Sequence, residues 1–576
     1  MSAATANASA TISEATVETH LLSGKDLVEG NVDYRGQPAK RVKSGRWRSA
    51  CFIIGVEMAE RFAFNGVGAN LITYLTGPLG QSTSTAAENV NTWSGTAHLL
   101  PLFGAFVGDS LLGRYRTIVL ASLLYILALG LLTLTAVLPS ECQDVSKLGD
   151  CSPHQLQIVI FFVSLYLFAM AQGMHKPCVQ AFGADQFDEK DPEEAKAKSS
   201  FFNWWYFSLC VAVLVTLVIL TYIQENLSWG LGFGIPCIVM GFAVILFLSG
   251  TMTYRFRVNS DKRDPFLRIG FVFVKAARNW RNFTSSICME EDGQRALPNL
   301  GSQQFEFLNK ALAVSDGSEE GSEVSDISEV EEAKTVLRLL PILTTCLVYG
   351  IVYSQSSTLC TKQGVTMDRS ITPSFQVPAA SLQSFIVISI IVFITVYDQI
   401  IVPVARYITG KPSGITTLQR IGTGLFISIL TMITAALVES KRLEIARKYG
   451  LVDKPNATVP MSVIWLVPQY TLLGVSEVFT MVGLQEFFYN EMPAELKSTG
   501  LALYLSILGV GGFLSSFLIS MIDKATGGDG HDSWISDNLN KGHLDYFYWL
   551  LAILSAVAFF AFLFTAKSYI YNRVHT

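Results

Sequence analysis

The sequence predicts an all-α integral membrane protein with about twelve transmembrane helices. Half of the 576 residues are hydrophobic and only 15% are charged, and the mean hydropathy of +0.38 is too high for a soluble protein of this size. Crossing a bilayer takes about 20 mostly apolar helical residues, and segments of that kind recur along the whole chain. The net charge of -5 is too small to indicate a nucleic-acid partner.

The predicted spans follow one another closely in each half of the chain. Three of them, the first, fifth and tenth, contain polar residues, so hydropathy supports them less than the others. In chain order the spans are 49–77, 90–112, 116–138, 156–181, 200–223, 230–253, 335–356, 380–402, 415–438, 461–488, 498–521 and 546–569.

A long polar segment separates the first six spans from the last six. Lys and Arg beside the first, second and sixth spans, among them Arg41 and Arg255, place the N-terminus in the cytosol. One basic loop, 439–460, which includes Arg442, does not fit this pattern, and we expect it outside. We therefore expect a disordered cytosolic tail, a six-helix bundle, a cytosolic linker, a second six-helix bundle and a cytosolic C-terminus, at 1–48, 49–253, 254–334, 335–569 and 570–576.

The linker itself has two parts. Residues 265–281 place apolar and basic side chains on different helical faces, which is typical of a helix lying along the inner membrane surface. Residues 316–332 alternate Ser with Asp and Glu, which indicates a solvated tether that a kinase could modify.

Two predicted outer loops carry candidate modification sites. Cys142 and Cys151 fit a disulfide and a pair of free thiols equally well. Asn456 begins an Asn-Ala-Thr sequon and is a candidate glycosylation site. The nine cysteines show neither CxxC spacing nor histidine partners, so the sequence predicts no metal site.

The first span contains charges that a membrane helix avoids. Glu57 and Arg61 are spaced i and i+4 on one helical face, with Glu60 beside them. Burying a charge at the centre of a span costs about 2.5–3.5 kcal/mol, so such residues need partners or a wet cavity. Two carboxylates around one guanidinium can exchange a proton while the arginine compensates the remaining charge. This chemistry is what a proton-coupled carrier requires.

The fourth helix of each half carries one further charge. Lys176 precedes a proline in the fourth span, and Glu477 lies near the middle of the tenth. If the halves are related by pseudo-symmetry, the two side chains form an ion pair that substrate and proton can break. For Lys176 the alternative is extension of its side chain to the inner membrane surface. Glu477 has no such alternative, so it is a functional candidate.

Several motifs resemble those of one transporter family. The stretch 57–62 reads ExxERF, as in the proton-coupled oligopeptide transporter family, the branch of the major facilitator superfamily that includes plant nitrate and peptide transporters. Further similar motifs, several of them closest to plant members, span both halves: 104–117, 176–178, 182–187, 202–207 and 486–489.

This resemblance implies a major facilitator fold of two six-helix bundles that alternate access between the two sides of the membrane. It implies proton coupling by Glu57, Glu60 and Arg61, and gating or substrate contact by Lys176 and Glu477. By the same comparison, Asp109, Arg114 and Arg116 fall in the loop of the inner gate, and Thr96 falls at a position phosphorylated in a nitrate carrier, which adds a regulatory kinase as a partner.

The sequence departs from the family where substrate is bound. Peptide carriers show paired tyrosines after ExxERF, where this chain has Phe64 and Asn65, and Tyr353 stands where a nitrate carrier has histidine. We expect a proton-coupled symporter for nitrate or a small organic solute, such as a peptide, hormone or glucoside. It would work in the plasma or vacuolar membrane, with lipid, protons and substrate as its partners and without a cofactor.

Two other classes of function are less consistent with the sequence. A transport-deficient membrane receptor or scaffold, signalling through 316–332, has no reason to retain charges inside its spans. An enzyme would require a nucleophile, metal or cofactor constellation, and the sequence shows none.

Overall fold

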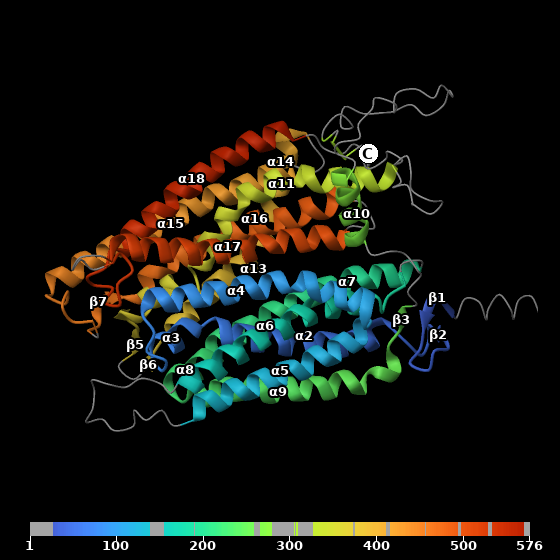
Figure 1. Cartoon of the computed structure of the whole chain (residues 1–576), viewed down its shortest axis with the longest axis horizontal. Helices are drawn as coiled ribbons and strands as arrows, with labels where there is room; N and C mark the ends of the chain where they lie inside the picture. The colour runs from blue at the N-terminus through green and yellow to red at the C-terminus, as the bar shows by residue number, and fades with distance from the viewer. Residues whose placement is uncertain are drawn as a thin grey trace, which may run out of the picture. The chain divides into compact units, whose positions relative to one another are not determined.

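The computed structural model is built almost entirely of long helices (Figure 1). It describes two compact units. Unit 1 takes its described residues from 1–67, 103–140 and 154–262, and unit 2 from 68–102, 141–153 and 263–576. The residues described are 27–138, 155–188, 191–257, 265–278, 305, 307–308, 327–372, 375–410, 415–455, 457–492, 497–527 and 533–569.

Unit 1 is a helical bundle in which α5 packs against both α6 and α9, as Figure 1 shows. Its buried face is made of apolar side chains such as Ile53, Leu129 and Phe161. Two prolines lie inside these helices without ending them, Pro177 in α6 and Pro236 in α9, as packing against neighbouring helices allows. The helices are α2 (Arg46–Gly68), η1 (Val107–Leu111), α5 (Arg114–Val137), α6 (Gln155–Ala184), α7 (Pro192–Val215), η3 (Thr216–Leu220), α8 (Thr221–Asn226), α9 (Trp229–Ser249) and η4 (Thr251–Thr253).

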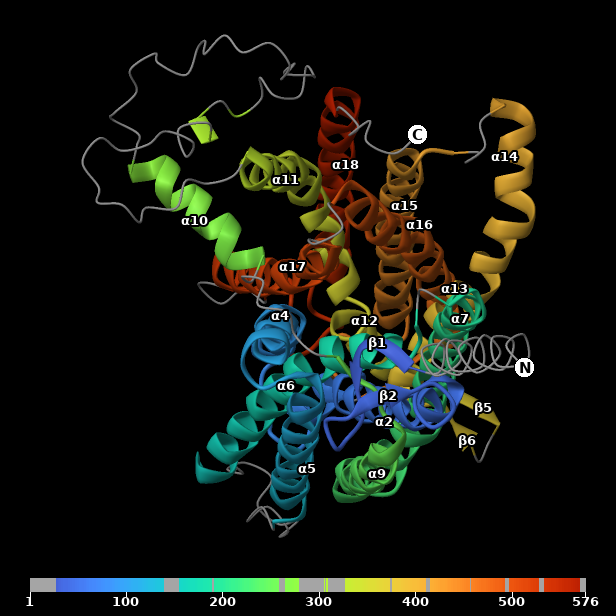
Figure 2. The same ribbon diagram turned by 90° about the vertical axis from the view of Figure 1, so that its right-hand side faces the viewer.

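A small antiparallel sheet joins the N-terminal segment of unit 1 to the chain that follows α9. Its order is β2 (Pro38–Lys40), β1 (Leu27–Val32) and β3 (Phe256–Arg257), and Figure 2 shows β1 beside β2. The sheet therefore ties residues at the start of the chain to residues more than 200 positions later.

Unit 2 packs α15 against α16 and α18, and α11 against α17. Its core includes Ile342, Leu425 and Phe488. The boundary between the units falls inside α4, after residue 102. The helices are α3 (Leu71–Thr76), α4 (Thr83–Phe106), α10 (Pro265–Arg278), α11 (Ile327–Ser354), α12 (Leu359–Val365), η7 (Ala379–Gln383), α13 (Ser384–Val396), η8 (Tyr397–Ile401), α14 (Val402–Thr409), α15 (Thr417–Lys448), η9 (Val463–Leu466), α16 (Val467–Glu491), α17 (Lys497–Thr526) and α18 (Leu544–Ser568).

Short strands pair at one end of unit 2. Strand β4 (Met367–Asp368) runs parallel to β7 (Val459–Ser462), and β5 (Ser370–Thr372) pairs with β6 (Phe375–Gln376) in an antiparallel hairpin. They connect helices and contribute nothing to the functional groups described below.

The predicted all-α membrane fold is confirmed. Among the described residues, ten helical segments are long and apolar enough to cross a membrane. Helices α2 and α4 have 23 and 24 residues, so they too reach the length of a span, but their polar side chains lower their hydropathy.

Some helix ends differ from those that hydropathy predicts. The predicted first span, 49–77, is interrupted after Gly68, in a Gly-Val-Gly-Ala-Asn run of low helix propensity, and resumes as α3. Helix α15 continues to Lys448 although charges fill its last turns, because Arg442 and Glu439 neutralise each other there. Helix α11 begins at Ile327, within the predicted linker.

The amphipathic helix expected in the linker is present as α10. Its Val272 and Ala276 are buried in one apolar cluster with Val330 and Ala333 of α11. Phe271, by contrast, is exposed. An orientation of α10 along the inner membrane surface stays a prediction. Cys142, Cys151, Asn456 and residues 316–326 lie outside the described residues.

Candidate functional site

The three charged residues of α2 form one cluster in unit 1. Arg61 Nε lies 3.0 Å from Glu57 Oε1, to which it donates a hydrogen bond, and 3.4 Å from Glu60 Oε2. Glu57 and Glu60 are 2% and 0% exposed. The i, i+3, i+4 spacing brings the groups together because they share one face of a continuous helix. The cluster that the spacing predicts is therefore present, with one guanidinium between two buried carboxylates.

A tyrosine that the sequence reasoning missed completes this cluster. Tyr125 of α5 is fully buried, and its hydroxyl donates a hydrogen bond of 2.7 Å to Glu60 Oε1. Its ring packs edge-on against Phe168 of α6. A tyrosine in the middle of an otherwise apolar span was the available signal, because a buried hydroxyl needs a hydrogen-bond partner.

Lys176 of α6 lies within electrostatic reach of Glu57, Glu60 and Arg61. Its side chain is half-buried. With both carboxylates ionised, these two cations and two anions sum to zero charge. Unit 1 thus brings together four of the residues that the sequence singles out.

Glu477 belongs to α16 in unit 2. Its Oε2 is buried and has no hydrogen-bond partner among the described residues. The buried Tyr349 of α11 lies within its electrostatic reach, and the ring of Tyr353 lies beside that of Tyr349, with centroids 6.5 Å apart. The sequence prediction that Lys176 and Glu477 act as a pair stays a prediction.

At the two positions where the sequence departs from peptide carriers, both side chains contact other parts of unit 1. Phe64 stacks on Phe168 with centroids 6.2 Å apart and an interplanar angle of 3°. Asn65 donates a hydrogen bond of 2.9 Å to the carbonyl oxygen of Arg61. Apolar and amide groups thus stand where tyrosine hydroxyls would be expected.

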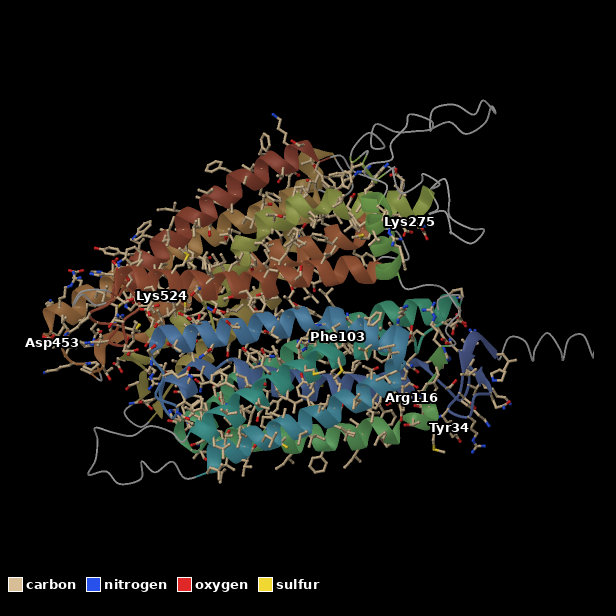
Figure 3. All side chains as sticks on the ribbon, in the orientation of Figure 1. Tyr34, Phe103, Arg116, Lys275, Asp453 and Lys524 are labelled. Carbon is tan, nitrogen blue, oxygen red and sulfur yellow. The ribbon has the colours of Figure 1, made fainter. Side chains whose placement is uncertain are left out.

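The predicted inner-gate residues belong to η1 and to the start of α5. Arg114 at the start of α5 pairs with Asp185, just after α6, which the sequence reasoning had not linked to it. Arg116 is exposed on the surface of unit 1 (Figure 3). The side chain of Asp109 on η1 lies outside the description. Their role in a gate stays a prediction.

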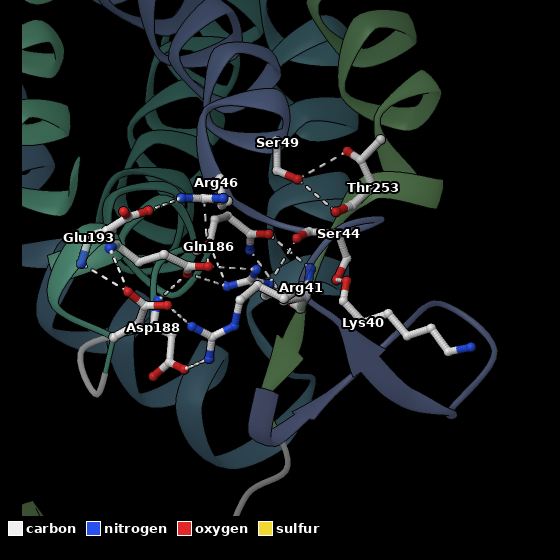
Figure 4. Close-up of polar contacts among 12 residues, drawn as sticks. Lys40, Arg41, Ser44, Arg46, Ser49, Gln186, Asp188, Glu193 and Thr253 are labelled. Atoms are coloured by element: carbon white, nitrogen blue, oxygen red, sulfur yellow. Dashed lines mark hydrogen bonds and ion pairs between the residues drawn. The ribbon is translucent and has the colours of Figure 1, made fainter. Parts of the chain in front are cut away.

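A second buried ion pair of unit 1 joins Arg255 to Glu194, and Figure 4 labels Ser44 and Gln186, whose backbone Arg255 also bonds. Arg255 Nη1 donates to Glu194 Oε2 at 2.7 Å, and neither side chain is exposed. Arg255 also donates to the carbonyl oxygens of Ser44 and Gln186. Gly45 has a φ of +78°, and an added Cβ would lie 2.2 Å from Arg255 Nε, so only glycine fits there.

The charges around Glu194 outweigh its burial. Burial alone would raise the pKa of this carboxyl, but hydrogen bonds from Arg255 and from the backbone N–H of Asp188, with the charges of Arg255 and Arg41, hold the pKa below its usual value. Arg41 itself pairs with Asp188 and Asp191 (Figure 4). The positions of Arg41 and Arg255 beside predicted spans indicate loop charges, whereas in the structure both residues anchor the N-terminal segment.

Thr96, the candidate phosphorylation site, lies within α4. Its hydroxyl donates a hydrogen bond of 2.8 Å to the carbonyl oxygen of Thr92, and its side chain is half-buried. Phosphorylation there stays a prediction. In the described parts of the chain, no three His, Cys, Asp or Glu side chains gather as a metal site would require.

Comparisons with known proteins identify the family. Residues 115–535 match the model of the POT family. Over 554 residues the chain is 60% identical to NRT1/PTR FAMILY 5.10 of Arabidopsis thaliana, covering 96% of this chain and 98% of that protein, and over 561 residues it is 55% identical to NRT1/PTR FAMILY 5.14 of the same plant, covering 97% and 99%.

The fold is similar to that of a solved structure, an auto-inhibited POT family peptide transporter. The TM-score is 0.69 at 20% identity, over 92% of this chain and 99% of that one. This similarity confirms the expected major facilitator fold. The plant relatives confirm the predicted membership of the plant nitrate and peptide transporter family. The chain belongs to the POT family and is a multi-pass membrane transporter, not an enzyme.

Proposed function

We propose that this transporter is a symporter that moves nitrate or a small organic solute, such as a peptide, hormone or glucoside, together with protons. The observation that carries the proposal is Arg61 lying between the buried carboxylates of Glu57 and Glu60. Transporters of this family are driven by the proton gradient, and no cofactor enters the proposed mechanism.

The charge balance of unit 1 supports coupling between proton and solute. With both carboxylates ionised, Lys176 and Arg61 are fully compensated. When one carboxylate takes up a proton, the group of Glu57, Glu60, Arg61 and Lys176 has a net charge of one positive unit. An anionic group of the solute can neutralise it, so proton and solute each favour the binding of the other. Alternating access of the two bundles would then carry both across the membrane.

The packing of Phe64 and Asn65 bears on the solute. Because Phe64 stacks on Phe168, this part of unit 1 offers an apolar ring rather than a hydroxyl. Tyr353 likewise offers a phenol where nitrate contact would use an imidazole. The ring of Phe64 favours an organic solute over nitrate, and uptake of a solute panel at two pH values would identify the solute.

The coupling role of Glu60 is tested in a voltage-clamped cell that expresses the protein. Acid outside, together with a transported solute, should evoke inward current, and Glu60→Gln should abolish the coupling. Glu444→Gln removes an exposed carboxylate from α15 and serves as the control, with the surface level of each variant measured. An undiminished proton-coupled current in Glu60→Gln would contradict the proposal.

We also propose that the protein works in the plasma membrane or the vacuolar membrane, in contact with lipid, and that a kinase modifies Thr96. Imaging of a fluorescently tagged full chain distinguishes the two membranes. Phosphopeptide mapping tests the modification, with Thr96→Ala as the control. A Thr96 that stays unmodified in cells grown with and without the solute would contradict this proposal.

A further inference from the structure

A row of side chains on α6 faces Tyr125. Phe168, Gln172 and His175 are spaced i, i+4 and i+7, so they share one face of the helix. The rings of Phe168 and His175 both lie edge-on to Tyr125, with centroids 4.9 and 5.8 Å away. Gln172 lies between them along the helix and is therefore turned toward the same tyrosine.

The two polar members of this row are buried without protein partners. Gln172 and His175 are both 0% exposed. Neither amide atom of Gln172 and neither ring nitrogen of His175 has a hydrogen-bond partner among the described residues. Buried polar atoms in native proteins are almost always bonded, and ordered water serves where protein groups do not. We therefore expect water to be bound between this row and its neighbours.

The charges around His175 come mainly from the cluster of Glu57, Glu60 and Arg61 on α2. Helix α2 brings Glu60 and Arg61 within electrostatic reach, and Lys176 is the next residue on α6 itself. From α5 comes Tyr125, whose hydroxyl donates to Glu60. Other titratable groups near this row are Glu57, paired to Arg61, and Cys178, three residues after His175 on α6. Asp109 lies on η1, which packs on α6, and its side chain is not described.

We propose that His175 is a further proton-transfer residue of this transporter, exchanging protons with Glu60 through the Tyr125 hydroxyl and water held by Gln172. The inference rests on the proposed function, which assigns the coupled proton to the cluster on α2. It adds a route for that proton within unit 1. Histidine suits such a route because one ring nitrogen can take up a proton while the other releases one.

The transfer toward Glu60 balances as follows. A protonated His175 gives its N–H proton to the water, the water gives a proton to Tyr125 Oη, and the tyrosine's own proton passes to Glu60 Oε1. One N–H bond of His175 breaks and one O–H bond of Glu60 forms. Water and Tyr125 are neutral before and after, and the imidazole returns to its neutral form.

The test uses the full chain, labelled with ¹⁵N-histidine and reconstituted in phospholipid vesicles. Solid-state NMR follows the ring nitrogens from about pH 5 to about pH 8, the range in which histidines titrate. The His175 signal is identified by its loss in His175→Gln. The signal of His98 on α4, identified in the same way, is the matched control.

We expect the His175 signal to change tautomer or protonation across this range, and the change to shift in both Glu60→Gln and Tyr125→Phe while His98 is unaffected. Thermal unfolding of each variant verifies that it is folded. A His175 that keeps one neutral tautomer throughout, or that responds identically in wild type and both variants, overturns the inference. Failure of the proposed function is distinct, since it would appear as persistent proton-coupled current in Glu60→Gln.

Discussion

Arg255 and Glu194 form an ion pair of 2.7 Å that is fully enclosed by unit 1. The pair joins the residue just before β3 to the first turn of α7, 61 positions apart in sequence. The same arginine bonds the backbone of Ser44 and Gln186. One side chain thus holds three chain segments together.

Arg255→Ala should therefore be strongly destabilising. Removing one partner of a buried pair leaves the other charge unpaired, at a cost of roughly 3–5 kcal/mol. We expect a lower unfolding temperature for the purified protein in detergent. Arg35→Ala is the control, since it removes an exposed arginine between β1 and β2. Equal losses in the two variants would contradict the role assigned to Arg255.

The Arg255–Glu194 pair should make the stability of the folded protein sensitive to acid. The folded protein holds the pKa of Glu194 below its usual value, whereas an unfolded chain has a glutamate pKa of about 4.3. The folded state therefore binds fewer protons in the interval between the two pKa values, so stability falls as pH decreases through it. The contribution is complete above the unfolded value and lost below the folded one.

Glu194→Gln tests this sign. The variant should be less stable at neutral pH, and its unfolding temperature should depend less on pH than that of wild type below about pH 5. Identical pH profiles for the two proteins would show that Glu194 makes no such contribution.

A close contact between backbones gives a third prediction. A Cβ added to Gly104 would lie 2.1 Å from the carbonyl oxygen of Gly173 in α6, and backbone cannot move aside as a side chain can. Gly104→Ala should cost roughly 1–3 kcal/mol through overpacking. Gly130→Ala on α5 is the matched control, because nothing lies within 4 Å of its added Cβ. Thermal unfolding that ranks Gly130→Ala as the more harmful change would refute this account.

The sequence predicted the fold and the charged cluster on α2 because both follow from short-range regularities. Apolar length predicts a membrane helix, and the i, i+4 spacing of Glu57 and Arg61 places them on one face. Tyr125, Asp185 and Glu194 were missed because their partners lie on other parts of the fold, at separations of 61 to 71 residues. Such pairings depend on how distant segments pack together, which a single sequence does not reveal.

Two arginines that follow predicted spans are buried rather than exposed. Arg255 and Arg442 looked like loop cations, but both are fully buried beside glutamates. Glu439 precedes Arg442 by three residues, and that spacing was an available signal. Glu194 comes 61 residues before Arg255, so no local rule connects them.

The final prediction concerns Lys176 and Glu477, each of which we expect to be needed for transport. Once a solute of the panel gives proton-dependent uptake, Lys176→Ala and Glu477→Ala should each lower the initial rate at least about 10-fold, which corresponds to a rise of about 1.4 kcal/mol in the barrier to transport. If the two residues are functionally coupled, the double variant should transport no more slowly than the slower of the two single variants, because effects of coupled residues are not additive. Lys448→Ala, which removes an exposed lysine at the end of α15, controls for the loss of a positive charge. Fully additive losses would mean that the two residues act independently, and unchanged rates would remove both from the transport mechanism.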